Sequence, residues 1–311
     1  MSSTDPARPP LRVTVAGNPG LDTLVLLPGA ELDLAVDTHF VRNVDTVGHA
    51  AAFVARLFAR MGARVRILGS VGEDLAGRFV TEALAADGVD TSLLFVDPAG
   101  TARSVNLIRP DGRRTACYDG GSHMTLQPPE ANLDAALADT DLVVSTLANW
   151  ARHVVGRARA RGIPVAVDLQ DVRHPSDPYR ADFVANADLL FASAAHLADP
   201  TGAALAWCEA GPAQAVVFGR GAAGAMAVRP VGVIEQPPPR LDLPVVDTTG
   251  CGDALAVGVL DALVAHGTDL AGALQRGQVL ARIVASEPGA QAHVDPARVA
   301  ALATAAASAS S

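Results

Sequence analysis

The sequence predicts an α/β fold with three layers, in which helices cover both faces of a mainly parallel central sheet. Two observations predict it. Short, nearly continuous apolar runs alternate with longer alanine-rich stretches of helical spacing, which is typical of βαβ units. Half of the 311 residues are hydrophobic and only 4% are aromatic, so the chain can bury a large core made mainly of Ala, Val and Leu.

The central sheet is expected to be Rossmann-like, because its apolar runs are those of strands covered on both faces. The expected strands are Arg12–Ala16, Val65–Gly69, Leu142–Thr146, Val165–Asp168, Leu189–Ala192 and Ala215–Gly219. The helices expected around them are 49–61, 73–87, 150–161, 179–186 and 253–265. This order predicts one domain over residues 11–305, with disordered termini at 1–10 and 306–311.

Two segments depart from this pattern. Residues 32–47 and 93–118 alternate apolar and polar side chains at period two, and the second contains the turn signal Asp111-Gly112. Such alternation indicates half-exposed antiparallel strands. We therefore expect both segments to form a small β-sheet lid over one edge of the main sheet.

Composition excludes several functions. The formal net charge of −9 gives no basic surface for nucleic acid or an anionic membrane. All 24 basic residues are arginine, so catalysis that needs a phosphate-binding or Schiff-base lysine is excluded. The three cysteines are far apart and suggest neither a disulfide framework nor a zinc site. With a polar start and no apolar run of spanning length, the chain is expected to be cytoplasmic.

The stretch "VVDTTGCGDALAVGVL" (245–260) carries the strongest functional signal. It predicts a strand end, a loop with almost no side chains, and a helix that begins near Asp253. Gly250 and Gly252 let the backbone approach a ligand, and the free N–H groups of a helix start stabilise an anion. A carboxylate beside such a turn can accept a proton from an attacking hydroxyl. Helix capping alone would not require both glycines.

At this point the sequence resembles a known family. Residues 247–253, "DTTGCGD", resemble the D-T-[TV]-G-A-G-D motif of ribokinase-like (PfkB-type) carbohydrate kinases, with Cys251 in place of alanine. "VAGNPGLDTLV" (15–25) is similar to the first strand and turn of the family. "RMGARVRILGSVGEDLAGRFV" (60–80) resembles the segment after its first long helix. The similarity extends over about residues 13–296.

The resemblance implies an ATP-dependent phosphotransferase that uses Mg²⁺ and phosphorylates a hydroxyl, typically hydroxymethyl, of a sugar or sugar-like molecule. It implies Asp253 as catalytic base, with Gly250, Cys251 and Gly252 forming the anion hole. Asp247 and Thr249 match a site where many members bind a monovalent cation such as K⁺. The implied substrate residues are Asn18, Asp22, Gly48, His49, Phe53 and Asn106, and the implied nucleotide residues are Ser193, Gly219, Gly221, Gly224 and Gly289.

Three departures from the family pattern affect the expected site. The element G-G-x-x-x-N becomes "GHAAAF", so His49 replaces a glycine and Phe53 replaces the asparagine that contacts substrate. In the N-x-x-E element, Ser193 and His196 stand where the Mg²⁺–phosphate network is expected. Gly219 takes the threonine position of a T-x-G turn. These changes suggest an altered acceptor and an altered metal arrangement.

Two alternatives stay open. A nucleoside kinase is one, because "GNPGLD" resembles an adenosine-kinase-like turn and Phe53 could stack on a base. A non-catalytic sugar or nucleotide sensor is the other, favoured by the missing N-x-x-E pair and opposed by the retained Asp253. The family resemblance also implies a homodimer that pairs through the β-lid.

Overall fold

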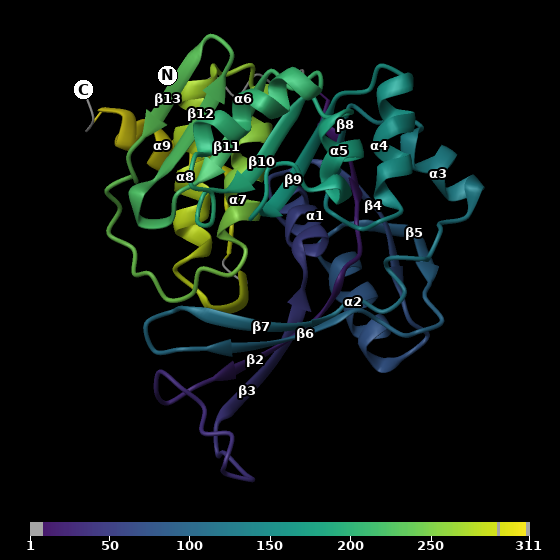
Figure 1. Cartoon of the computed structure of the whole chain (residues 1–311), viewed down its shortest axis with the longest axis vertical. Coiled ribbons are helices and arrows are strands. Elements are labelled where there is room, and N and C mark those ends of the chain that lie inside the picture. Colours follow the sequence, from purple (N-terminus) through teal and green to yellow (C-terminus); the bar gives the residue numbers. More distant parts are fainter. Residues whose placement is uncertain (1–8, 291–292, 309–311) are drawn as a thin grey trace.

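The computed structural model describes residues 9–290 and 293–308. Its larger sheet has nine strands (Figure 1). In spatial order the strands are β13 (Gly232–Gln236), β12 (Ala225–Arg229), β11 (Ala215–Gly219), β10 (Leu189–Ser193), β9 (Val165–Asp171), β8 (Leu142–Ser145), β1 (Arg12–Ala16), β4 (Arg64–Val71) and β5 (Asp90–Val96). Six pairs of neighbouring strands are parallel, and the two pairs at one edge, β11–β12 and β12–β13, are antiparallel.

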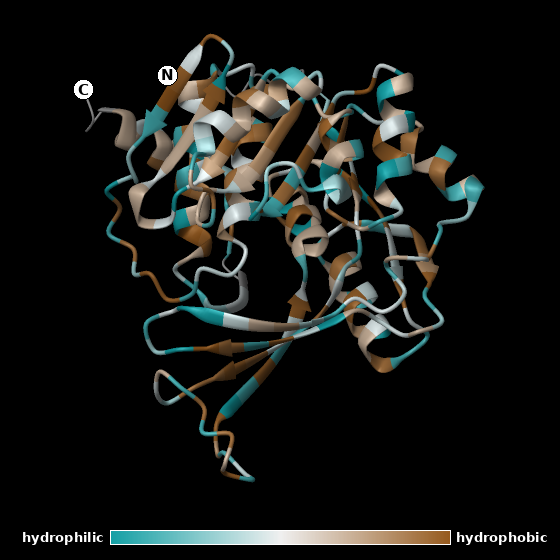
Figure 2. Ribbon diagram, in the orientation of Figure 1, coloured by the Kyte–Doolittle hydropathy of each residue, from teal (hydrophilic) through white to brown (hydrophobic). Residues whose placement is uncertain are grey.

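Helices cover both faces of this sheet, and each face has its own buried apolar cluster. The strands between the two clusters are apolar along most of their length (Figure 2), which is the pattern expected of parallel strands buried on both sides. One face packs against α1 (Ala50–Arg60), α2 (Leu75–Ala86), α7 (Cys251–Leu260), α8 (Leu270–Val284) and α9 (Pro296–Ser308). The other packs against α3 (Glu130–Leu137), α4 (Ala151–Ala160), α5 (Ala181–Val184) and α6 (Pro200–Ala210). This arrangement confirms the predicted three-layer fold.

The strand order reverses between β1 and β8. From β1 the chain runs outward through β4 and β5, and then returns to place β8 on the other side of β1. In open parallel sheets, ligands bind outside the carboxyl ends of the strands at such a reversal. The topology therefore indicates where a functional site lies.

A second, four-stranded sheet lies beside the large one, in the order β3-β2-β6-β7 (Figure 1). Its strands are β3 (Arg42–Gly48), β2 (Gly20–Leu26), β6 (Arg103–Ile108) and β7 (Arg114–Asp119). The Asp111-Gly112 turn joins β6 to β7, as predicted, and all six residues of β7 are exposed. The predicted small sheet is thus present.

The predicted composition of that sheet was partly wrong. Only residues 42–48 of the first segment are a strand, because Asp33 accepts a hydrogen bond from the Ala35 N–H and folds the preceding residues into turns. The fourth strand is instead β2, which the sequence analysis had treated as a turn after the first strand. Residues 93–96 belong to β5, at the edge of the large sheet.

Other boundaries also differ from expectation. The helix expected at 253–265 begins at Cys251 and changes to π-helical geometry over Asp261–Ala265. At 179–186 the regular α-helix is only Ala181–Val184. The sequence analysis did not identify β12, β13, α3, α6, α8 or α9. Helix α9 reaches Ser308, three residues beyond the expected end of the domain, while residues 1–8 and 309–311 lie outside the described residues.

Within 9–290 and 293–308, no helix combines the length and apolar character needed to cross a bilayer. The three cysteines are free thiols.

Candidate active site

A cavity of about 1220 Å³ opens at the carboxyl edge of the large sheet, between α7 and the small sheet. Residues at or just beyond the ends of five parallel strands line it: Asn18 after β1, Thr146 after β8, Asp171 in β9, Ser193 in β10 and Gly219 in β11. Asp168, further back in β9, lines it as well. Asp22, Asn106 and Arg114 line it from the small sheet. The cavity therefore occupies the place that the strand reversal indicates.

The loop before α7 is fixed from behind by a buried carboxylate. Oδ1 of Asp247 accepts hydrogen bonds from the backbone N–H and the hydroxyl of Thr249, at 2.9 and 2.8 Å. Its Oδ2 accepts one from the N–H of Gly289, at 2.8 Å. Asp247, Thr249 and Gly289 therefore hold the loop to the segment after α8. None of the three is among the residues that line the cavity.

Helix α7 begins with a left-handed residue, Gly250, at φ 74° and ψ 1°. This conformation favours glycine and turns the chain so that Cys251, Gly252 and Asp253 form the first helical turn, facing the cavity. A Cβ atom on Gly252 would meet no atom within 4 Å. Packing within the chain therefore does not explain this glycine, whereas a ligand close to the backbone would. The first N–H groups of a helix favour an anion at this position.

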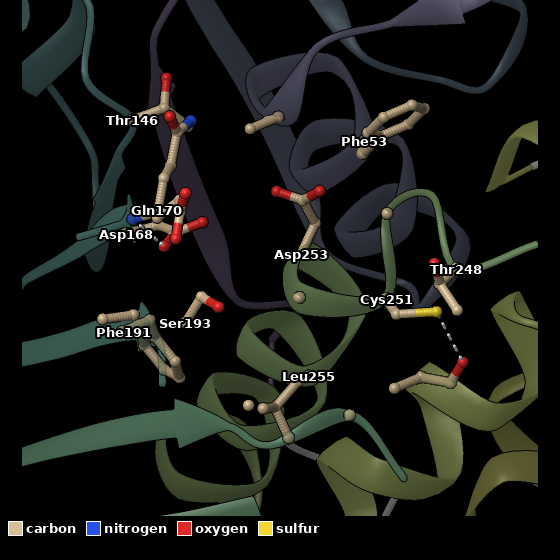
Figure 3. Close-up of a pocket in the computed structure, with 18 of the residues that line it drawn as sticks. Phe53, Thr146, Asp168, Gln170, Phe191, Ser193, Thr248, Cys251, Asp253 and Leu255 are labelled. Carbon is tan, nitrogen blue, oxygen red and sulfur yellow. Dashed lines mark hydrogen bonds between the residues drawn. The ribbon is translucent and has the colours of Figure 1, made fainter. Parts of the chain in front are cut away.

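The carboxylate of Asp253 points into the cavity (Figure 3). Its Oδ1 is buried and has no hydrogen-bond partner among the described residues. Burial raises the pKa of Asp253 well above its usual value, and the nearby carboxylate of Asp168 raises it further. A buried carboxyl group without a partner is costly and is characteristic of catalytic acids and bases.

Asp168 reaches the same cavity from β9 (Figure 3). Burial raises its pKa to about 6, although Oδ1 accepts a hydrogen bond from the N–H of Gln170 at 2.8 Å. Gln170 has a positive φ of 56°. The backbone is therefore bent sharply where the two carboxylates meet the cavity.

Several polar atoms at the small-sheet end of the cavity are buried without a partner. They are Oδ1 of Asp22, Nδ2 of Asn18, and both side-chain polar atoms of Asn106. Buried polar groups are almost always hydrogen-bonded in native proteins. Their concentration in one pocket indicates a site for a polar ligand. Burial raises the pKa of Asp22 to about 6, although the guanidinium of Arg114 opposes this shift.

Two residues of the altered "GHAAAF" element differ in their surroundings. His49 lines the cavity, and its Nε2 atom lies 3.6 Å from Oδ1 of Asp22. Phe53 also lines the cavity, but it is 4% exposed and belongs to the apolar cluster around α1 and α7. Gly48 does not line the cavity. A Cβ atom there would lie 2.0 Å from Cγ of Asp22, so Gly48 provides space for that carboxylate.

The far end of the cavity is lined by glycines and short side chains. Gly219, Gly221, Gly224 and Ser193, four of the residues that the family resemblance assigns to the nucleotide, all line it. The hydroxyl of Ser193 accepts a hydrogen bond from the Ala195 N–H at 3.2 Å. His196 lies outside the lining and pairs with Asp171 through Nδ1, at 2.6 Å.

The sequence analysis did not identify Arg114, Tyr118 or Arg282 as site residues, although all three line the cavity. The guanidinium of Arg114 makes no hydrogen bond or ion pair with other described residues. It lies close enough to Asp22, Cys251 and Asp253 to lower the pKa of each. No local motif marks Arg114, because its position depends on how the small sheet faces α7.

The thiol of Cys251 is half-buried and contacts the Ala281 carbonyl at 3.6 Å (Figure 3). Burial raises the pKa of this thiol to about 12.

Comparison with protein families gives one match over most of the chain. Residues 38–298 match the pfkB family carbohydrate kinases. Among curated proteins, the acarbose 7(IV)-phosphotransferase of Actinoplanes sp. is 30% identical over 252 residues, which cover 80% of this chain and 83% of that protein. The aminoimidazole riboside kinase of Salmonella typhimurium is 29% identical over 243 residues, covering 68% and 72% of the two chains.

Among solved structures, a microbiome-derived acarbose kinase superimposes with a TM-score of 0.88. It is 29% identical, and the match covers 95% of this chain and 100% of that one. Sequence and structure comparisons thus agree on the fold and on the family.

Proposed function

The chain belongs to the pfkB family of carbohydrate kinases, and on that basis we propose that it transfers the γ-phosphoryl group of ATP to a hydroxymethyl group of a sugar or sugar-like molecule. The observation that carries this proposal is Oδ1 of Asp253, which is buried without a hydrogen-bond partner at the start of α7. It stands beside the open backbone of Gly252.

In the proposed reaction, Asp253 accepts the proton of the acceptor hydroxyl as its oxygen attacks the γ-phosphorus. The bond from that phosphorus to the ADP oxygen breaks, and ADP leaves. The N–H groups at Gly250, Cys251 and Gly252 stabilise the charge on the transferring oxygens. A pKa above the usual aspartate range suits a base, because the carboxylate then holds the accepted proton more readily.

The residues present fit ATP and Mg²⁺. Gly219, Gly221 and Gly224 line one end of the cavity, and the backbone of Gly221 is exposed there for phosphates. Mg²⁺ in such sites is held by one or two carboxylates together with substrate phosphates, and Asp168 and Asp171 of β9 are carboxylates on this wall. When bound, Mg²⁺ neutralises charge on the phosphates. Asp247 and Thr249 remain our proposal for a monovalent cation such as K⁺.

The acceptor is proposed to bind at the small-sheet end. Asp22, Asn18 and Asn106 carry unsatisfied buried polar atoms that match several hydroxyl groups. Acarbose is the first acceptor to test, because two relatives that cover most of the chain carry it in their names. A nucleoside acceptor is the second candidate, supported by the ring of Phe53 in the cavity wall and by the aminoimidazole riboside kinase relative.

The test is an ADP-release assay with acarbose, ribose, ribose 1-phosphate and inosine as acceptors, with and without K⁺. We expect turnover with at least one of them. The Asp253→Asn variant should lose turnover by about 10²- to 10⁴-fold while ATP still binds. Near-normal turnover in that variant would contradict the assignment of the base. Acceptor binding with only background ATP consumption would instead favour a non-catalytic sugar or nucleotide sensor. The loss of the N-x-x-E pair, with Ser193 and His196 in its place, also favours that alternative.

We also propose that two copies pair through their small sheets. The edge strand β7 is exposed along its whole length, and Leu34, Phe40 and Val105 are exposed apolar side chains on or beside this sheet. Sedimentation of the wild-type chain should give twice the monomer mass, and a Leu34→Asp/Phe40→Asp variant should sediment as a monomer. A monomeric wild type would contradict this proposal.

A further inference from the structure

The backbone of His49 has φ 69° and ψ 147°, a conformation that residues other than glycine rarely adopt. Only two other non-glycine residues in the described part of the chain, Asp139 and Gln170, have a positive φ. This region of φ and ψ is close to one that is used almost entirely by glycine, so a histidine there is strained. Such strain persists only where the surroundings hold the residue in place, and it concentrates at sites that bind ligands.

The imidazole of His49 lies inside the acceptor end of the cavity, with 8% of its side chain exposed. Its Nε2 atom is 3.6 Å from Oδ1 of Asp22 and 3.4 Å from the hydroxyl oxygen of Ser104. The ring packs against Tyr118, with centroids 5.2 Å apart. Burial lowers the pKa of His49 to about 4, so the ring is neutral at pH 7 and has one N–H donor.

The backbone around His49 leaves space for this ring. A Cβ atom on Gly20 would lie 2.4 Å from Cε1 and 2.5 Å from Nδ1 of His49. Gly20 therefore provides the room that the imidazole occupies, as Gly48 does for the Asp22 carboxylate. The side chains of His49 and Asp22 therefore each occupy space that a glycine, Gly20 or Gly48, leaves open.

The gap between His49 and Asp22 has the chemistry of a hydroxyl site. Oδ1 of Asp22 is buried, has no hydrogen-bond partner, and can only accept. The distance of 3.6 Å is too long for a direct hydrogen bond with Nε2. A hydroxyl group is both donor and acceptor, so one hydroxyl can donate to Oδ1 while it accepts from Nε2 in the imidazole tautomer that carries its proton there.

We infer that His49 is a specificity-determining residue, which together with Asp22 holds one hydroxyl of the acceptor from two sides. This inference rests on the proposed function and identifies the acceptor as a polyhydroxylated molecule that presents a free hydroxyl between the two side chains. An acceptor without that hydroxyl leaves Oδ1 of Asp22 unpaired in a buried site, and such sites reject it strongly. The imidazole thus gives the second glycine position of the family motif a recognition role in this chain.

The experiment compares wild type with His49→Ala, His49→Gly and His49→Gln, using whichever of acarbose, ribose, ribose 1-phosphate and inosine has the lowest KM. Alanine and glycine both remove the donor, so each should raise the acceptor KM about tenfold and leave the ATP KM within about twofold. Glutamine carries an N–H donor at a similar reach and should restore most of the affinity.

Thermal unfolding provides a second readout. Glycine normally lowers stability relative to alanine, but at a strained positive φ the order reverses. The His49→Gly variant should therefore melt at a higher temperature than His49→Ala, although both bind the acceptor equally weakly.

An unchanged acceptor KM in the alanine and glycine variants would overturn the inference, as would equal rises in the acceptor and ATP KM values. A melting temperature of His49→Ala above that of His49→Gly would contradict the backbone strain at His49 from which the inference starts. A wild-type chain that turns over none of the four acceptors would instead contradict the proposed function, and the inference with it.

Discussion

Asp168 in β9 and Asp253 in the first turn of α7 direct two carboxylates into one cavity (Figure 3). The negative charge of Asp168 contributes to the raised pKa of Asp253, after burial. The predicted base, Asp253, thus interacts with a residue more than eighty positions earlier in the sequence. Substitution of Asp168 should therefore change the pKa of Asp253, which an experiment can measure.

Asp168→Asn should shift the acid limb of the pH–rate profile to lower pH. The proposed base acts when it is deprotonated, so activity rises as pH passes through its pKa. Removing the neighbouring negative charge lowers that pKa. The profile of kcat against pH measures this shift, and an acid limb that stays in place or moves upward would show that the two groups do not interact.

Arg114→Gln should shift the same limb in the opposite direction. The guanidinium of Arg114 lowers the pKa of Asp253, so its removal raises that pKa and moves the acid limb to higher pH. We also expect kcat/KM at pH 7 to fall about tenfold or more, because the cavity loses an unpaired cation that could face phosphate. Arg113→Gln is the matched control, since Arg113 pairs with Asp111 on the turn and is 76% exposed. If the two variants changed kcat/KM and the acid limb equally, Arg114 would have no role in the site.

Gly252→Ala should impair turnover without impairing the fold. The added methyl group meets no atom within 4 Å, so the free energy of unfolding should change by no more than about 1 kcal/mol. In the proposed complex the same methyl lies where the phosphoryl oxygens approach the backbone, and turnover should fall at least about tenfold. Gly156→Ala is the control, because that glycine lies in α4, away from the cavity, and also has open space beside it. Full activity of Gly252→Ala would show that the glycine serves no ligand.

Asp253→Asn should stabilise the protein, and more so at pH 7 than at pH 5. A carboxyl group whose pKa is raised on folding binds its proton more tightly in the folded state. Its contribution to stability is therefore lost as pH rises from about 4 through the raised value. Asparagine does not ionise, so the variant avoids this loss at neutral pH. Denaturant unfolding at both pH values measures the difference, and a gain that is larger at pH 5 would contradict the raised pKa.

The prediction of the fold from sequence succeeded for strands with continuous apolar runs and failed where the sequence pattern was ambiguous. Six predicted strands of the large sheet are present because burial on both faces leaves a strong local signal. The alternation over residues 32–41 looked like a strand, but no neighbouring strand pairs with it and Leu34 and Phe40 remain exposed. Strand β2 was missed because Asp22 and Thr23 interrupt its apolar run, so the local pattern is that of a turn after the first strand.

The sequence by itself determined the part of the site that is contiguous in the chain. The motif 247–253 specifies a left-handed glycine, a helix start and an acidic first turn, and all three are local properties of the backbone. Only the tertiary structure decided which side chains face that turn. Asp168, Arg114 and the pair of Asp22 and His49 come from separate strands and a helix start, and their burial and charge interactions exist only when the two sheets enclose one cavity.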